Sequence, residues 1–367
     1  MPLLDRRHLL TVLGTGLVAA PCLALPARRA FAAGDFAQRL AAAEQSGKIS
    51  GLHALLVSQG GKLLFEHYGN GVDEIGGSAR DTVNFGPEVL HDLRSVSKSV
   101  VGLAYGIALS QGKVPPPEAG LYEQFPEYAD LARQPGREKI TVGHALSMTL
   151  GLEWDELTVP YGSDLRNSEI AMEAAPDRFR FILGLPIVGE PGVKWTYCGG
   201  ATAILGRLIA SGTGEKLPAY VRRVLFDPMD FGSSQWRGGA DGEPRAASGC
   251  RLLPRDMLKL GQLALAGGAW QDKQIVPAEW VERITTPTVR IEGARSYGYH
   301  WYIHDNMVDG QRRYWFGGIG WGGQKLYVFP GLDLVVAMNC GNFRKPGIEQ
   351  NRINVAVLTD VVFPSLA

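Results

Sequence analysis

The sequence predicts a mixed α/β (α+β) domain in which one antiparallel sheet is flanked by helices and carries an inserted helical lobe. Apolar runs at 53–58 and 62–67 flank a Gln-Gly-Gly turn at 59–61, which is a hairpin signature near the N-terminus. Strand-like runs return only in the last third of the chain. Because helix-like segments separate these two sets, we expect both ends of the chain to meet in one helix-covered sheet.

The remaining elements follow from composition and spacing. Segments with helical spacing lie at 36–46, 96–109, 199–211, 254–266, 277–284 and about 350–361. The strands expected in the last third are 297–303, 314–317, 325–329 and 334–339. The stretch from about 115 to 195 is rich in Pro, Gly, Asp and Glu, with short helical segments near 141–149 and 168–184. We interpret it as the helical lobe, with long loops, packed onto the sheet.

The first 32 residues are interpreted as a targeting segment. Arg6-Arg7 precede an uncharged, moderately apolar stretch over 8–27, and Ala30-Phe31-Ala32 follows it. This order resembles a twin-arginine export signal and predicts a periplasmic or secreted protein whose domain covers 33–367. An uncleaved anchor is the alternative, although the prolines and glycines within the stretch disfavour a spanning helix. No later segment is long and apolar enough to cross a bilayer.

Composition narrows the class of partner. Lys+Arg and Asp+Glu both number 37, and no basic cluster resembles a nucleic-acid footprint. We therefore expect a small-molecule substrate and no nucleic acid.

Three cysteines follow the targeting segment. Because three is an odd number, they cannot all form disulfides, and we expect buried thiols, with one disulfide left open as an alternative. They are Cys198, Cys250 and Cys340.

Ser95-Val96-Ser97-Lys98 is the sharpest local feature. If Ser95 opens a helix, residues three apart share a face, and the Lys98 ammonium reaches the Ser95 hydroxyl. A serine hydroxyl is a weak nucleophile until a neighbouring base takes its proton, and the helix start favours a developing anion. Alone, however, an S-x-x-K pattern describes equally well an N-cap serine followed by a solvated lysine.

Two later features support the interpretation of Ser95 as a nucleophile. Tyr197 stands between a Pro/Gly-rich turn and a helix, where its hydroxyl could point into a cleft. The run 317–323 holds five glycines in seven residues and leads directly into the strand at 325–329. Such a run indicates a backbone that approaches another group closely, for example an edge that offers an N–H to an oxyanion.

In this order, the three features resemble the serine β-lactamase/penicillin-binding superfamily, whose pattern is S-x-x-K, a tyrosine or serine motif, and a K-T-G-type strand. The resemblance is closest to the class C-like branch, which includes carboxylesterases and 6-aminohexanoate-dimer hydrolases. It covers most of the chain after the targeting segment. The segments 148–156 (MTLGLEWDE), 191–192 (PG), 255–261 (RDMLKLG) and 322–330 also match the branch.

The resemblance implies a transpeptidase-like sheet with a helical lobe, and it implies roles for individual residues. Ser95 is the nucleophile, Lys98 its proton partner, and Tyr197 the general base and acid. The backbone N–H groups of Ser95 and Gln324 form the oxyanion hole. Tyr161 matches a tyrosine that binds the leaving group in nylon oligomer hydrolases.

Two departures from the pattern bear on the substrate. Tyr-Cys-Gly replaces the usual Tyr-x-Asn at 197–199, and Trp321-Gly322-Gly323 replaces Lys-Thr-Gly. Without that lysine, the pocket should bind an anionic lactam poorly, and Trp321 suggests an apolar acyl or alcohol group, with Trp154 and Trp195 also near the site. We therefore expect a hydrolase of esters or small amides. The alternatives are a β-lactamase or D,D-peptidase, and a non-hydrolytic penicillin-recognising protein.

The sequence gives little support for a metal site or for a cysteine nucleophile. His300 and His304 are four residues apart in a strand-like context, where that spacing is about 13 Å and too long to share a metal. Cys198 has no histidine close in sequence to activate it. We expect no cofactor and no metal.

Overall fold

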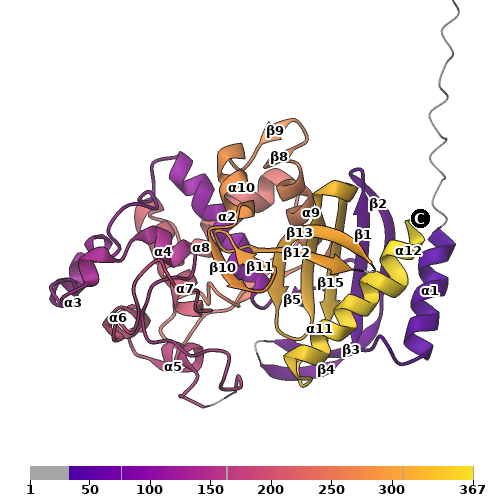
Figure 1. Cartoon of the computed structure of the whole chain (residues 1–367), viewed down its shortest axis with the longest axis horizontal. Helices are drawn as coiled ribbons and strands as arrows, with labels where there is room; N and C mark the ends of the chain where they lie inside the picture. Colours follow the sequence, from indigo (N-terminus) through magenta and orange to yellow (C-terminus); the bar gives the residue numbers. More distant parts are fainter. Residues whose placement is uncertain (1–32, 76, 163, 309, 367) are drawn as a thin grey trace, which may run out of the picture. The chain divides into compact units, whose positions relative to one another are not determined.

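The computed structural model describes residues 33–366 apart from 76, 163 and 309. The targeting segment expected over 1–32 lies outside these residues. In the described chain, one large antiparallel sheet has the strand order β10-β11-β12-β13-β14-β15-β1-β2 (Figure 1). These strands are β10 Val289–Glu292, β11 Arg295–Tyr297, β12 Tyr302–Val308, β13 Gln311–Gly320, β14 Gln324–Phe329, β15 Leu334–Cys340, β1 Leu52–Gln59 and β2 Lys62–Tyr68.

The first and last strands of the described chain, β1 and β15, are neighbours in this sheet, close to its β2 edge. β1 pairs with β15 in an antiparallel register that sets Leu55 opposite Met338 and Val57 opposite Val336. On its other edge β1 forms the hairpin with β2 that the glycine turn predicts. The prediction of a single antiparallel sheet built from both ends of the chain is therefore confirmed.

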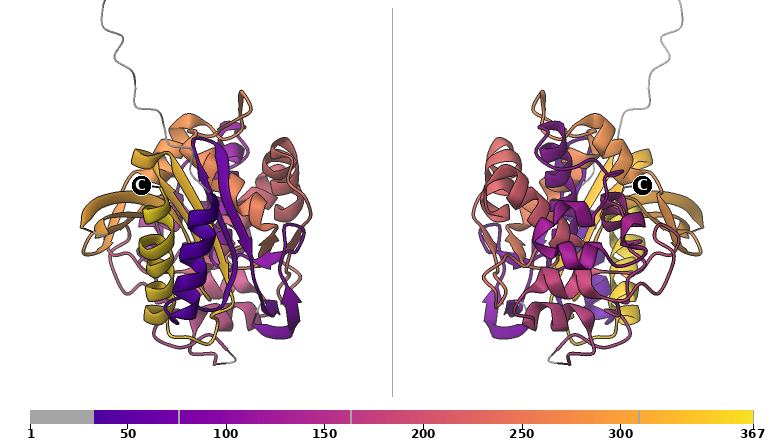
Figure 2. Two further views of the ribbon diagram at one scale, coloured as in Figure 1. Left: turned by 90° about the vertical axis from the view of Figure 1, so that its right-hand side faces the viewer. Right: turned by 90° about the vertical axis from the view of Figure 1, so that its left-hand side faces the viewer.

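Helices cover both faces of the sheet because its strands are apolar on both sides. Alternate residues of a strand point to opposite faces, and Leu55 and Val57 belong to one core whereas Ala54 and Leu56 belong to the other. Figure 2 shows helix α1 (Ala33–Gln45) beside the C-terminal helix on the first face. That helix comprises α11 Gly347–Ala356, a π-helical segment Val357–Val362 and α12 Phe363–Ser365. The second face is covered by α2 Val96–Ser110 and α9 Pro254–Leu265.

The segment expected to form the helical lobe, about 115–195, contains helices α3, α4, α5 and α6. Helix α7 packs against α4, α5 and α6 as well as against α2, and α8 packs against α7. Their bounds are α3 Ala129–Ala132, α4 Val142–Leu146, α5 Ser168–Ala174, α6 Arg178–Gly184, α7 Gly199–Thr213 and α8 Leu217–Val221. Helix α10 Ala278–Thr285 contacts α2. No described helix has both the length and the hydropathy of a membrane span.

Three local predictions need correction. The strand expected over 297–303 is broken by a turn between β11 and β12, where His300 has a φ of 64° and bonds Leu146 and Thr202. The final helix starts at Gly347, before the expected residue 350. Four short pairings were not predicted: the hairpin of β3 Asn70–Ile75 with β4 Ser78–Asn84, the three-stranded sheet of β5 His91–Asp92, β7 Cys250–Leu252 and β6 Ser234–Trp236, and the pair β8 Ala269–Trp270 with β9 Lys273–Gln274.

Candidate active site

Ser95 lies at the start of α2, where a glycine-bearing strand crosses it. It occupies the N-cap position, and among the described residues no backbone carbonyl accepts its N–H. Strand β13 reaches this point because it carries glycine where a side chain would collide. A β-carbon at Gly320 would lie 2.5 Å from the Leu93 carbonyl oxygen, and one at Gly318 would lie 2.9 Å from a Val96 methyl. The glycine run predicted to mark a close backbone approach therefore does so beside Ser95.

Lys98 follows one helical turn later and points back at the serine. Its Nζ donates to Ser95 Oγ at 3.1 Å and to the Ala247 carbonyl at 3.2 Å. The side chain is only 2% exposed, and Nζ also lies 4.7 Å from the centre of the Tyr197 ring and 4.0 Å from Glu156 Oε1. The i, i+3 geometry expected from the sequence is therefore present, in a site screened from bulk water.

Tyr197 is buried next to the same serine, just before α7. It hydrogen-bonds Ser95, and Cys198 caps α7 by accepting the Ala201 N–H at 3.3 Å. Burial raises the pKa of Tyr197 well above that of a free phenol, and the nearby Glu156 carboxylate raises it further. The phenol therefore holds its proton in the resting site, which makes it a hydrogen-bond donor first.

A buried pair of glutamates beneath Lys98 was not predicted from the sequence. Glu156 and Glu169 share a hydrogen bond, and burial raises the pKa of Glu156 to about 8, with the charge of Glu169 adding to the effect. Burial alone would also raise the pKa of Glu169, but Lys98 and the hydrogen bonds from Glu156 and Ser248 bring it below its usual value. At neutral pH the pair therefore carries one proton, on Glu156, and one negative charge that faces Lys98.

Glu156 is held firmly by neighbouring donors. Its Oε2 accepts from Trp154 Nε1 at 2.9 Å and from the Gly199 N–H at 2.6 Å, while its Oε1 accepts from the Tyr161 hydroxyl at 2.8 Å. The segment 148–156 was matched to the family, but it holds three acidic residues at 153, 155 and 156. The sequence alone does not show which of them is buried.

Ser95 opens into a pocket of about 410 Å³. Tyr161 and Trp321 line the pocket with it, and their rings lie 5.9 Å apart. Gly322 and Gly323 do not line it; they have φ values of 87° and 98° and form the tight turn that places Trp321. Trp321 Nε1 donates to the Phe343 carbonyl at 2.8 Å, which fixes the indole at the rim.

Gln324 opens β14, opposite Gly320, so its backbone lies in the strand pair that crosses the start of α2. Its side chain is fully buried, and Nε2 donates to the Cys340 carbonyl at 2.6 Å while Oε1 accepts the Cys340 N–H at 3.0 Å. Gln324 as a whole has no exposed surface and does not line the pocket, so its part in an oxyanion hole stays a prediction.

Two features of the pocket add to what the sequence indicated. Trp154 and Trp195 are not among its lining residues, because Trp154 is buried on Glu156 and Trp195 packs against Tyr197 and Tyr297. The pocket also contains cations other than the missing motif lysine. Although Trp321 stands where the family carries a lysine, four arginines from other elements line the pocket, together with three glutamates.

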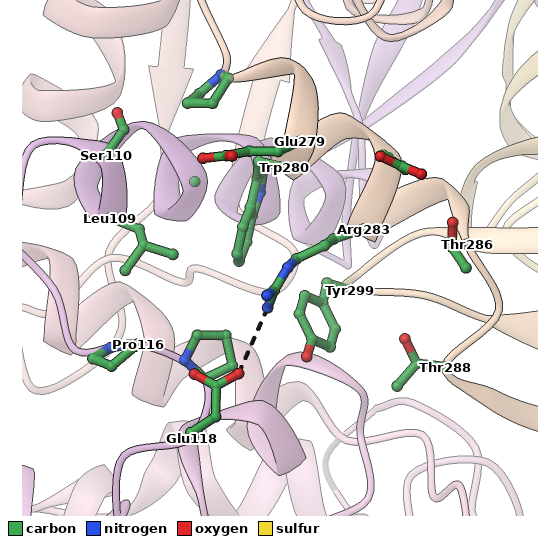
Figure 3. Close-up of a pocket in the computed structure, with 14 residues that line it drawn as sticks. Leu109, Ser110, Pro116, Glu118, Glu279, Trp280, Arg283, Thr286, Thr288 and Tyr299 are labelled. Atoms are coloured by element: carbon green, nitrogen blue, oxygen red, sulfur yellow. Dashed lines mark ion pairs between the residues drawn. The ribbon is translucent and has the colours of Figure 1, made fainter.

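A second pocket, of about 620 Å³, contains none of the predicted site residues. It lies between α2, α10 and the loop at 116–118, and Figure 3 shows Arg283 directed toward Glu118, with the two charged groups 3.7 Å apart. Its lining offers hydroxyl groups and an ion pair but no nucleophile with an adjacent base. In the part of the chain that the structure describes, we find no cluster of three metal-ligating side chains, and the three expected thiols are buried and unbridged.

Comparison with known proteins places this geometry in context. A family model described as Beta-lactamase matches residues 36–357. A 6-aminohexanoate-dimer hydrolase from Paenarthrobacter ureafaciens is 25% identical over 338 residues, which cover 89% of this chain and 81% of the relative. Among solved structures, EstCE1, a hydrolase with promiscuous acyltransferase activity, superposes with a TM-score of 0.67 at 14% identity and covers 88% of this chain and 99% of its own. A penicillin binding protein from Bacillus halodurans gives 0.64 at 18% identity, covering 87% and 98%.

Proposed function

The chain belongs to the Beta-lactamase family of hydrolases, and on that premise we propose that it cleaves esters or small amides through an acyl-enzyme on Ser95. The observation that carries this proposal is the 3.1 Å contact of Lys98 Nζ with Ser95 Oγ, in a buried position at the edge of a pocket. A nucleophile and a group able to take its proton must lie within hydrogen-bond reach, and these two do.

We assign the steps as follows. The Ser95 oxygen attacks the carbonyl carbon, and its proton passes to the Lys98 amine, which accepts it after losing its own proton to solvent. The substrate oxygen becomes an oxyanion, which the backbone N–H groups of Ser95 and Gln324 stabilise; loss of one such donor costs about 3–4 kcal/mol of barrier in comparable sites. The tetrahedral adduct collapses and expels the alcohol or amine, which receives a proton from Tyr197, and Tyr197 regains one from Lys98. Water then attacks the acyl-enzyme and releases the acid and Ser95.

The burial of Tyr197 is the reason why we assign the base to Lys98 and the acid to Tyr197. A phenol whose pKa is raised by burial holds its proton, so it is a better acid for the departing group than a base for the incoming serine. Tyr161 lines the pocket, and its hydroxyl donates to Glu156, so we assign its oxygen as an acceptor for a departing amine or alcohol.

The test combines a fluorophosphonate probe with three substrates: a short-chain 4-nitrophenyl ester, a linear amide dimer and a chromogenic cephalosporin. We expect the probe to label Ser95 and the ester or the amide to be turned over, with Ser95→Ala and Lys98→Ala each losing about 1000-fold or more in kcat/KM. Full activity in Ser95→Ala would refute the mechanism.

The same assay separates the alternatives. Fast cephalosporin turnover would favour a β-lactamase, and labelling of Ser95 without turnover of any substrate would favour a non-hydrolytic penicillin-recognising protein. The simultaneous presence of Ser95, Lys98 and Tyr197 supports the hydrolase, because deacylation needs a proton relay that a binding protein does not require.

We also propose that the protein is exported by the twin-arginine route. The support is the order of Arg6-Arg7, an apolar stretch and Ala30-Phe31-Ala32. Fractionation of cells that express the full chain should find it outside the cytoplasm, and replacement of both arginines by lysine should retain it inside. Equal distribution of the two forms would contradict the proposal.

A further inference from the structure

The charges around the Ser95 pocket are not balanced. Of the four arginines that line it, two are neutralised by carboxylates. Arg94 lies 2.8 Å from Glu74, and Arg245 Nε lies 3.0 Å from Glu173.

The other two arginines of the pocket lack such partners. Arg237 is half-buried and Arg344 is exposed. Among the described residues, no side chain forms an ion pair or a hydrogen bond with either guanidinium. Burial lowers the pKa of Arg237, and the neighbouring cations Arg245 and Arg94 lower it further, whereas the carboxylates of Asp92 and Glu173 act in the opposite direction. A guanidinium nevertheless stays charged in proteins, so Arg237 is a partly desolvated cation beside two others.

The carboxylates nearest to Arg237 are shared with other cations, and Asp92 pairs with Arg251 at 2.7 Å. Glu173 contacts the buried Arg178 at 3.3 Å as well as Arg245. Glu169 accepts from the Ser248 hydroxyl at 3.0 Å, shares the hydrogen bond of the buried glutamate pair and faces Lys98. The charge that remains at the mouth of the pocket is therefore positive.

Backbone hydrogen bonds hold Arg237 in the wall of the pocket that Ser95 also lines. Its N–H donates to the Gly249 carbonyl at 3.0 Å, and its carbonyl accepts the Arg245 N–H at 2.8 Å. The segment just before Gly249 carries the Ala247 carbonyl that holds Lys98. A guanidinium on this loop is thus tied to the framework that positions the lysine beside Ser95.

We propose that Arg237 is a specificity-determining residue that binds a carboxylate of the substrate, with Arg344 at the rim as a weaker second contact. The substrate class is therefore an ester or small amide that carries a free carboxylate away from the bond that breaks. A guanidinium pairs with a carboxylate through two parallel hydrogen bonds, and an incoming anion would relieve the repulsion among the arginines. This inference rests on the proposed function and narrows it.

Two esters of equal chain length test the inference: mono-4-nitrophenyl adipate, which ends in a carboxylate, and 4-nitrophenyl hexanoate, which ends in a methyl group. Rates are corrected for hydrolysis without enzyme. We expect the wild-type enzyme to prefer the adipate ester in kcat/KM. Arg237→Gln should reduce that preference at least about 10-fold, mainly through KM, the size expected for loss of a charge-assisted contact. Arg237→Lys should restore part of it, and added salt should weaken it in the wild type.

Arg133→Gln is the matched control, because Arg133 is an exposed arginine that does not line the pocket. It should leave the ratio of the two rates unchanged. An equal ratio in wild type and Arg237→Gln, or a wild-type preference for hexanoate, would overturn the inference while leaving the serine hydrolase itself intact.

A binding experiment separates this inference from the proposed function. Calorimetry with Ser95→Ala compares adipamic acid, which carries a carboxylate, with hexanamide, which does not. Tighter binding of adipamic acid that disappears in the Ser95→Ala/Arg237→Gln double variant supports the carboxylate site even if no ester is hydrolysed. Equal affinities for the two amides, or an affinity for adipamic acid unaffected by Arg237→Gln, would refute it.

Discussion

Replacement of Glu156 by glutamine tests the shared proton of the buried glutamate pair. Glutamine has nearly the same shape as the protonated acid, and its single oxygen can accept from Trp154 Nε1 and the Gly199 N–H, the two donors to Oε2. Its NH₂ group then takes the place of Oε1, where it can donate to Glu169 and to the oxygen of Tyr161, whose hydroxyl no longer donates to residue 156. Glu156→Gln should therefore fold. In Glu156→Ala three donors lose their acceptor: Trp154 Nε1, the Gly199 N–H and the Tyr161 hydroxyl. Each lost contact should lower the free energy of unfolding by about 1–3 kcal/mol.

The size of the expected stability change follows from the pKa of Glu156. Burial, and next the charge of Glu169, raise this pKa from 4.5 to about 8. Between these pH values the unfolded chain has lost the proton of Glu156 and the folded protein keeps it. The folded state then binds one proton more, so the free energy of unfolding falls by about 1.4 kcal/mol per pH unit as pH rises. Glutamine does not titrate. From about pH 5.5 to 7.5 the wild type should thus lose about 2–3 kcal/mol relative to Glu156→Gln.

Urea unfolding at four pH values across this window measures the difference. Because the pKa of Glu169 is lowered, Glu169 changes its protonation below this pH window and does not affect the comparison of wild type with Glu156→Gln. Glu153→Gln changes an exposed glutamate three residues earlier and should follow the wild type at every pH. If wild type and Glu156→Gln lose stability in parallel, Glu156 is ionised in the folded protein and the description of the pair as one proton and one charge is wrong.

Three further predictions concern the pocket and the thiols. Gly322→Ala should lower the free energy of unfolding by about 2–4 kcal/mol in urea titrations, because its φ is 87° and a β-carbon would lie 2.3 Å from the Phe343 ring, whereas Gly331→Ala meets open space and should be nearly neutral. Tyr161→Phe removes the hydroxyl that donates to Glu156 and should lower kcat/KM about 10-fold for the amide or ester, with unchanged kinetics as the contrary result. Burial raises the pKa of every described thiol, so Ellman's reagent should modify them quickly only after denaturation, and a fast native reaction would contradict their burial. These thiols are Cys198, Cys250 and Cys340.

The sheet could be predicted because its signals are local. The hairpin turn at 59–61, the apolar runs around it and the strands of the last third are each visible within about ten residues. The β3–β4 hairpin was missed because its side chains are mostly polar and exposed, so it lacks an apolar face to reveal the strand period. The break between β11 and β12 was missed because His300 adopts a positive φ, which the sequence of a non-glycine residue does not announce.

In the candidate site, too, the contacts between residues close in sequence could be predicted and those between distant residues could not. Ser95 and Lys98 are three residues apart on one helix, so their contact follows from helical geometry alone. Glu156 and Glu169 come together with Lys98 only through the folding of the helical lobe, and nothing local distinguishes Glu156 from the acidic residues beside it. Burial, a property of the whole fold, determines which carboxyl holds a proton.

The arginines of the pocket show why a motif does not determine a binding preference. Trp321 in place of a lysine removes one cation from one strand, and from this the sequence predicts weak binding of an anionic lactam. The pocket wall, however, is assembled from several elements, and Arg237 enters it from the loop after β6, far from Trp321 in the chain. A substrate responds to the summed charge at the site and not to the element that supplies it. The absence of the motif lysine therefore argues against one position for a substrate carboxylate, while the unpaired Arg237 argues for another.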